Sequence, residues 1–229
     1  MYDTKNIKPK LCNRLAISWL KVKKVKEYQY SAKFYDGILF PFIRPIRNRV
    51  ISLVKQYCYG SILDVCCGTG DQLKLLKQHG FDGEGIDISD AMLNVAGKGE
   101  HKADCIRQDA TQMLYKDAKF DLVMTAFALH EKDHDTAQKI VEEMLRVTAE
   151  GGDMLIVDYE LSEKTSTLSK ILIYFIEWLA GGEHYRNFRS YIKKGGLPEL
   201  LSGITLAEVE RHYFARHGIV LLLLHREKS

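Results

Sequence analysis

The stretch Ser61-Ile62-Leu63-Asp64-Val65-Cys66-Cys67-Gly68-Thr69-Gly70 decides the fold of this 229-residue chain. Its first half is a short apolar run, which is typical of a buried strand. Gly68 and Gly70 then predict a tight turn, and Asp71 is the expected N-cap of a helix over 72–78. A strand, a glycine turn and a helix N-terminus together hold a nucleotide-like ligand against bare backbone.

Strands and helices alternate from this stretch to residue 159. After the first strand, four apolar segments predict further strands, at 83–88, 105–110, 120–127 and 154–159. Helical periodicity lies between them, most clearly over 136–148. This alternation predicts an α/β fold with a mainly parallel sheet. Segments 206–213 and 219–225 predict a closing antiparallel hairpin.

The composition is that of one globular domain, with 46% hydrophobic and 28% charged residues. Residues 1–27 form a basic leader, and residues 28–229 form the main domain. Within that domain, helices over about 162–202 predict an inserted cap. The apolar segment 168–180 within the cap is expected to be buried or to face a lipidic ligand.

The leader has two interpretations. Leu11, Leu15 and Trp19 follow helical spacing among eight Lys and Arg residues. They predict either a helix packed on the domain or a basic amphipathic helix on a membrane surface or partner.

The cysteine pattern and the hydropathy bear on location. Five cysteines without a CxxC pair suggest neither a disulfide framework nor a zinc site, and we expect no metal. No signal peptide is recognisable, and the longest apolar run is too short to span a bilayer. We therefore expect a cytoplasmic protein, with peripheral membrane contact through the basic N-terminus left open.

Four features fall at the carboxyl ends of the predicted strands, where such sheets bind ligands. They are the glycine turn, Asp87, Asp109 and the segment 127–131. Asp87 lies 19 positions after Gly68 and can accept both hydroxyls of a ribose. Asp109 and the 126–131 loop favour S-adenosylmethionine (SAM) over NAD as the ligand.

The chain resembles the class I SAM-dependent methyltransferases from about Tyr28 onward. Asp64 takes the acidic position of their acidic-x-Gly-x-Gly-x-Gly motif, and Cys66 replaces the first glycine. The same Asp-Val-Cys-Cys-Gly-Thr sequence is familiar in the quinone-biosynthesis C-methyltransferases. The resemblance implies a Rossmann-like sheet of seven mostly parallel strands. It departs at His130-Glu131, where the quinone enzymes carry Arg-Asn, and this leaves the acceptor open.

The resemblance also implies the cofactor contacts. The glycine turn would meet the methionine half, and Asp87 would hold the ribose. Ile88 would pack on adenine, and Asp109 would accept its amino group. The Ala126 carbonyl would take the α-ammonium group, and Tyr35 would reach the carboxylate from a lid. The expected contacts are Tyr35, Asp64, Cys66, Gly68, Gly70, Asp87, Ile88, Asp109, Ala110 and Ala126.

Methyl transfer needs alignment, exclusion of water and, for a hydroxyl or acidic carbon, a general base. His130 suits that role near neutral pH, and Glu131 is placed to orient it. His184, Tyr185 and Arg186 are expected to approach the acceptor from the cap.

The predicted function is methyl transfer from SAM to a small apolar or amphipathic acceptor, such as a quinol-like ring. The alternatives are methylation of a phospholipid head group or small metabolite on nitrogen or oxygen, and SAM binding without turnover. Nucleic acid is disfavoured as a partner, because the basic residues gather in the leader and the rest of the chain is net acidic.

Overall fold

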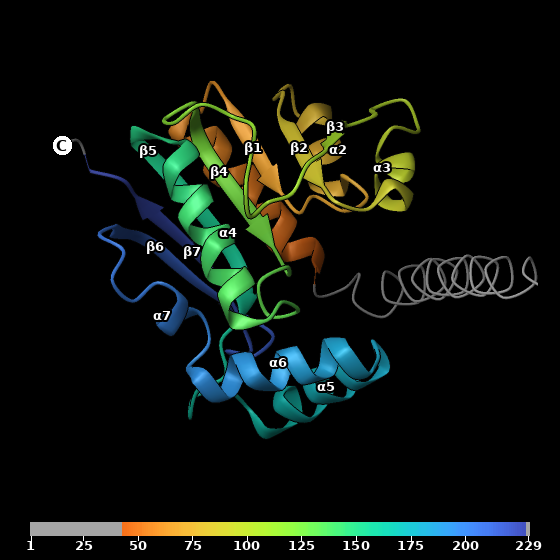
Figure 1. The fold of residues 1–229 in the computed structure, drawn as a ribbon, viewed down its shortest axis with the longest axis vertical. Coiled ribbons are helices and arrows are strands. Elements are labelled where there is room, and N and C mark those ends of the chain that lie inside the picture. The colour runs from red at the N-terminus through yellow and green to blue at the C-terminus, as the bar shows by residue number, and fades with distance from the viewer. Residues whose placement is uncertain (1–42, 228–229) are drawn as a thin grey trace, which may run out of the picture. The chain divides into compact units, whose positions relative to one another are not determined.

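In the computed structural model, the residues described are 43–227. One seven-stranded sheet forms their centre, in the order β3-β2-β1-β4-β5-β7-β6 (Figure 1). Strands β1 to β5 are parallel, and β7 lies antiparallel between β5 and β6. The strands are β1 (Ile62–Val65), β2 (Glu84–Asp87), β3 (Asp104–Arg107), β4 (Phe120–Ala126), β5 (Thr148–Tyr159), β6 (Ala207–Phe214) and β7 (Ile219–His225). The predicted α/β fold with a closing antiparallel hairpin is confirmed.

Helices cover the sheet and its carboxyl edge. A helix over residues 43–57 precedes β1. The later helices are α2 (Asp71–Gln78), α3 (Asp90–Ala96), α4 (His134–Val147), α5 (Thr167–Leu179), α6 (Gly182–Lys194) and α7 (Leu197–Leu200). Helices α5 and α6 pack against each other and form the cap (Figure 1). The basic leader 1–27 and Tyr35 lie outside the described residues.

Buried apolar strands at the centre of the sheet fix the carboxyl edge. Every residue of β1 is buried, and so are the first six residues of β7. Their neighbours β4 and β5 are almost as fully buried, which is typical of strands covered on both faces. The tips of β1, β2 and β4 therefore end on one rigid edge.

Strand β5 begins earlier than the sequence predicts. The sequence predicts a strand over 154–159, whereas the strand runs from Thr148 directly after α4 and so includes Gly151 and Gly152. The two glycines lie inside it, beside an irregularity in the pairing with β4. A Cβ atom on Gly152 would lie 2.9 Å from the Asp121 carbonyl oxygen. The glycines thus permit close backbone approach and do not end the element.

Helices α2 and α3 begin in different ways, and the N-cap predicted for α2 is wrong. Ser89 is the N-cap of α3, and its side chain accepts a hydrogen bond from the Met92 amide. Asp71 is the first residue of α2 and not its N-cap, because Gly70 takes that place in a left-handed conformation. Asp71 instead pairs with Arg47 at 3.2 Å.

Helix α5 is only half buried, although its sequence is apolar on nearly all sides. It buries Ile173, Ile176 and Glu177 against the rest of the described domain. Burial, the first of the two alternatives expected for this segment, does not hold for its outer face, where five large apolar side chains are between 45% and 65% exposed: Leu168, Ile171, Phe175, Trp178 and Leu179. Among the described helices, none is long and apolar enough to cross a bilayer.

Gly85 offers a test of the packing under the glycine turn. A Cβ atom there would lie 2.6 Å from Cys105 Sγ, 2.7 Å from Leu73 Cδ1 and 2.8 Å from Cys67 Sγ. We expect Gly85→Ala to lower the free energy of unfolding by about 1–3 kcal/mol through overpacking. Denaturant unfolding followed by circular dichroism measures this loss.

Gly97→Ala is the matched control. Gly97 has a negative φ, and the nearest atom to an added Cβ lies 3.6 Å away. Its free energy of unfolding should change by no more than about 0.5 kcal/mol. Equal losses in the two variants would contradict the packing argument.

Candidate active site

The glycine turn after β1 presents open backbone. Gly68 has a φ of 54°, and a side chain placed there would meet no atom within 4 Å. Cys66 has a φ of 59°, a left-handed conformation that costs a non-glycine residue roughly 1–2 kcal/mol. The turn therefore retains the glycine-like backbone of the motif at the position where cysteine replaces glycine.

Two aspartates lie next to the turn, Asp64 in β1 and Asp87 at the end of β2. The Asp87 carboxylate accepts hydrogen bonds from the Gly68 amide at 2.9 Å and the Ser89 amide at 2.8 Å. These bonds tie the turn to the tip of β2 and leave lone pairs for a ribose. Asp64 is buried in β1. Burial, followed by the nearby charge of Asp87, raises the pKa of Asp64 to about 7.

A pocket of about 120 Å³ lies between the 43–57 helix, the glycine turn and the ends of β4 and β5. Two of its polar residues escaped the sequence analysis, Arg47 and Gln72. The Gln72 Nε2 atom is buried and has no hydrogen-bond partner. An unpaired buried donor is costly unless a ligand satisfies it. This donor, with the Arg47 cation beside it, fits the carboxylate of an amino-acid moiety such as that of SAM.

The expected nucleoside contacts lie at the tips of β2 and β3. Ile88 is 61% exposed, so it offers an apolar surface on which a base can pack. Asp109 is exposed, and the amide and hydroxyl of Thr111 donate to one of its oxygens, at 2.9 and 2.7 Å. Ala110 is buried beside it, and Ala126 is exposed at the end of β4. These positions share one edge, and their cofactor contacts stay predictions.

Asp158 near the end of β5 organises the loop after β4, and the sequence analysis did not identify it. Its side chain is fully buried. Its Oδ2 atom accepts hydrogen bonds from the Leu129 and His130 amides, at 3.1 and 3.3 Å. Its Oδ1 atom lies 2.6 Å from His130 Nδ1 and accepts the Tyr159 amide at 2.7 Å. One carboxylate thus fixes both the backbone and the imidazole of His130.

His130 is enclosed by carboxylates and aromatic rings. Its Nε2 atom lies 3.5 Å from Glu177 Oε2, and its ring centroid is 4.7 Å from that of Tyr159. Burial alone lowers the pKa of His130, but the charges of Asp158 and Glu177 and the hydrogen bond with Asp158 outweigh it and raise the pKa to about 10. The imidazole is therefore charged near neutral pH. A general base must accept a proton, so the role expected for His130 would need the deprotonated form, and it stays a prediction.

Of the other predicted site residues, His184 contacts Glu177, a lone acid in the apolar run of α5 that the sequence analysis passed over. His184 Nε2 lies 2.6 Å from Glu177 Oε2, and His184 Nδ1 lies 3.4 Å from Glu131 Oε2. Tyr185 is half-buried beside the same ring cluster, whereas Arg186 is exposed. The structure thus brings His130, Glu131 and His184 together and leaves Arg186 outside. Their catalytic and acceptor-binding roles stay predictions.

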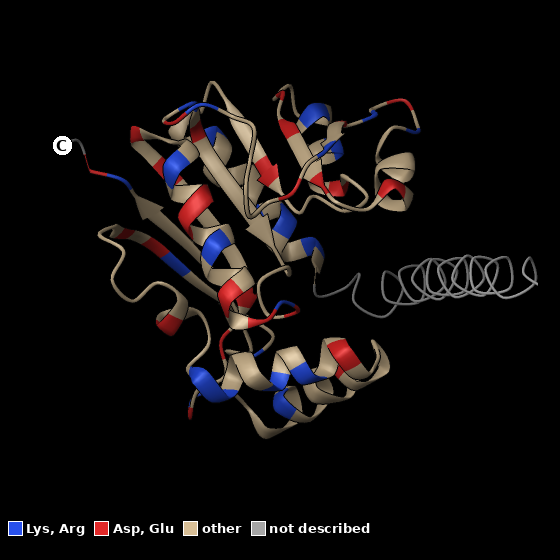
Figure 2. Ribbon diagram, viewed as in Figure 1, with Lys and Arg blue, Asp and Glu red and all other residues tan. Residues whose placement is uncertain are grey.

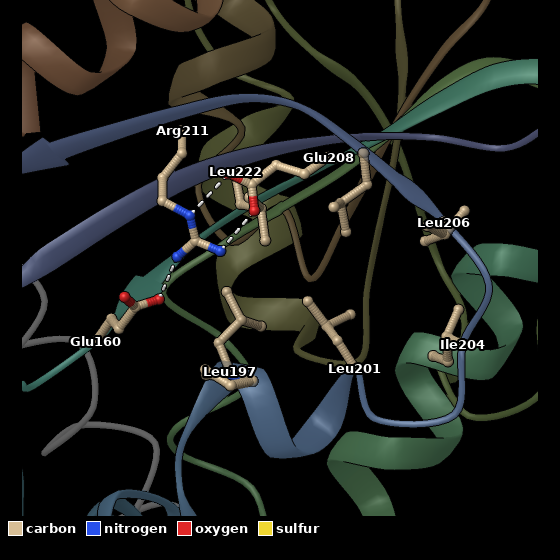
Figure 3. A pocket seen from close by; sticks show the side chains of 10 residues that line it. Glu160, Leu197, Leu201, Ile204, Leu206, Glu208, Arg211 and Leu222 are labelled. Carbon is tan, nitrogen blue, oxygen red and sulfur yellow. Dashed lines mark hydrogen bonds and ion pairs between the residues drawn. The ribbon is translucent and has the colours of Figure 1, made fainter.

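A second pocket, of about 210 Å³, lies between α7 and strands β6 and β7 (Figure 3). Leucines from α7 and β7 form much of its wall. Arg211 within it is paired with Glu160 at 2.7 Å and Glu208 at 2.8 Å (Figure 3). None of its lining residues belongs to the glycine turn. It is therefore separate from the candidate cofactor site.

Comparison with known proteins identifies the domain. Residues 62–152 match the family model described as a methyltransferase domain. The chain is 27% identical over 190 residues to the demethylmenaquinone methyltransferase of Bacteroides fragilis, covering 76% of this chain and 74% of that protein. It is 34% identical over 130 residues to the demethylmenaquinone methyltransferase of Staphylococcus saprophyticus, covering 54% of each protein.

Solved structures agree on the fold. Magnesium protoporphyrin IX methyltransferase from Synechocystis, a structure with bound SAH, matches with a TM-score of 0.62 at 14% identity. That match covers 94% of this chain and 100% of the other. An O-methyltransferase family protein from Burkholderia thailandensis matches with a TM-score of 0.64 at 16% identity, covering 85% of this chain and 59% of that one. At such identities the likeness shows the fold alone.

The sequence relatives and the methyltransferase-domain match agree with the open glycine turn and the unpaired donor beside it. The chain is a SAM-dependent methyltransferase, and it resembles the class I enzymes of the quinone methyltransferase group.

Proposed function

We propose that the protein methylates a small apolar or amphipathic acceptor with a quinol-like ring. The observation that carries this choice is the outer face of α5, whose five large apolar side chains are largely exposed. Phe175 and Trp178 stack there with ring centroids 6.1 Å apart. Exposed apolar patches of this kind mark sites for apolar ligands or membranes. Relatives named demethylmenaquinone methyltransferase support the same acceptor class.

The neighbouring helix α6 adds a charge pattern that suits a membrane surface. Its exposed basic residues are Arg186, Arg189, Lys193 and Lys194 (Figure 2). Basic side chains beside apolar ones favour contact with an anionic bilayer, where a prenylated quinol resides. We therefore propose peripheral membrane contact through the cap, besides any contribution from the basic leader.

The cofactor supplies an electrophilic methyl group on a sulfonium centre. The protein's part is to orient the two reactants and exclude water. Gln72 Nε2 and Arg47 would hold the cofactor carboxylate, and Asp87 would hold the ribose. Beside the acceptor, the Asn187 side chain of α6 donates to the Glu131 carbonyl at 2.9 Å and so ties the cap to the loop after β4.

The amine of a phospholipid head group or of a small metabolite is the second candidate. Glu131 and Glu177 lie where acidic groups would attract a cationic acceptor, and the Arg-Asn pair of the quinone enzymes is absent at 130–131. The outer face of α5 fits a phospholipid as well as a quinol. The acceptor assay described below distinguishes the two.

Gln72→Ala tests the carboxylate contact. It should weaken SAM and S-adenosylhomocysteine binding by about 10- to 100-fold, because a hydrogen bond to a charged group contributes roughly 1.5–3 kcal/mol. Isothermal titration calorimetry measures the dissociation constant. Gln78→Ala is the matched control, since Gln78 lies on the same helix with its side chain exposed. Similar affinities for the two variants would contradict the assignment.

Acceptor choice is tested with deuteromethyl-SAM and mixed vesicles that contain a short-chain prenylated quinol and phosphatidylethanolamine. We expect mass spectrometry to find the label on the quinol, and Gln72→Ala to reduce its amount at subsaturating cofactor. Label on the ethanolamine amine alone would reject the quinol and select the second candidate.

A further inference from the structure

Three metal-ligating side chains from three separate elements meet under the cap. His130 comes from the loop after β4, Glu177 from α5 and His184 from α6. One donor atom from each lies within 4.8 Å of the other two. His130 and Glu177 are at least 97% buried, and His184 is half-buried. The fold thus gathers two imidazoles and a carboxylate at one buried point.

The carboxylate at this point is not satisfied by hydrogen bonds. Glu177 Oε2 is buried and makes none, although it lies 2.6 Å from His184 Nε2 and 3.5 Å from His130 Nε2. The imidazoles are close to this oxygen without the geometry of N–H donors. A buried oxygen in this state is unfavourable unless another group binds it. It is directed at the same point as the two imidazoles.

Each imidazole also faces a second carboxylate on its other side. His130 Nδ1 lies 2.6 Å from Asp158 Oδ1, and His184 Nδ1 lies 3.4 Å from Glu131 Oε2. Metal-binding histidines repeatedly show this arrangement, because the outer carboxylate fixes the tautomer and directs the other nitrogen at the ion. This cluster contains two such pairs of an imidazole and an outer carboxylate.

Charge balance favours a cation at the same point. Asp158 and Glu177 are two buried carboxylates that both face His130, and a proton on this one imidazole compensates only part of their charge. Glu131 is already paired with Lys132 on the outer side. A bound dication would replace that proton and supply positive charge where the buried carboxylates and imidazoles converge.

We propose that His130, Glu177 and His184 bind one divalent metal ion of the zinc type. Two imidazole nitrogens and one carboxylate oxygen form a ligand set typical of zinc, and three protein ligands leave a fourth position open. Ligands of one tetrahedral zinc ion lie roughly 3.3 Å apart, so the Glu177–His184 contact would widen slightly on binding. The ion would tie both cap helices to the loop beside the proposed acceptor site. This inference does not depend on the identity of the acceptor.

The full chain, freed of metal by chelator and dialysis, is titrated with zinc against a chromophoric competitor. We expect one tight equivalent in the wild type. Glu177→Gln and His184→Ala should each weaken binding by about 100-fold or more, since losing even an outer carboxylate costs about 10–100-fold. His79→Ala removes an exposed histidine at the end of α2 and should leave the affinity unchanged.

Thermal unfolding supplies a second measurement on the same samples. Zinc should raise the melting temperature of the wild type and of His79→Ala but not that of His184→Ala, which removes a half-buried side chain and should leave the domain folded. Circular dichroism without metal verifies that fold. Wild-type zinc affinity in both ligand variants, or no bound zinc in the wild type, would overturn the proposal and leave a closed network of ion pairs. Neither result affects the proposed methyl transfer, because no cofactor or acceptor is present.

Discussion

The buried carboxylate of Asp158 is the interaction on which the proposed acceptor side of the molecule depends. It accepts the backbone amides of Leu129 and His130 and also the imidazole of His130, from a position near the end of β5. A fully buried charge must be paired and hydrogen-bonded to be tolerated. The loop after β4 therefore cannot leave β5 without exposing that charge to an apolar interior. The parallel pairing of β4 with β5 brings the two parts together.

The cofactor side depends on backbone, and that side is the part the sequence predicts well. Gly68, Gly70 and Asp87 act through turn geometry and through the meeting of strand ends at one edge, and both follow from local pattern. The apolar runs of β1 and β7 likewise predict buried strands. Gln72 was missed because a glutamine in the first turn of a helix is normally solvated. In the fold it lines a pocket together with residues of the 43–57 helix, and its amide nitrogen is buried and unpaired there.

The cap was predicted as a unit but not in its orientation. The composition of α5 is apolar on nearly all sides, so periodicity cannot tell which face is buried. Glu177 determines which face of α5 is buried, because its carboxylate faces inward to the two histidines. Phe175 and Trp178 then lie on the outer face. A polar residue buried by its partners on other elements is invisible to a local pattern. The same holds for Asp158, which reads as one polar position in an apolar strand.

Asp158 and Glu177 explain why the family resemblance indicates the cofactor but does not specify the acceptor. The glycine turn needs only its own loop and the tip of β2. The acceptor side needs the loop after β4, strand β5 and both cap helices, which are held together through one buried imidazole. Any change in the charge at His130 alters the compensation of both Asp158 and Glu177, because both carboxylates face the same ring. The position of the cap is therefore coupled to the electrostatics around His130, and under the proposed function we expect differences in acceptor among related enzymes at residues 130, 177 and 184.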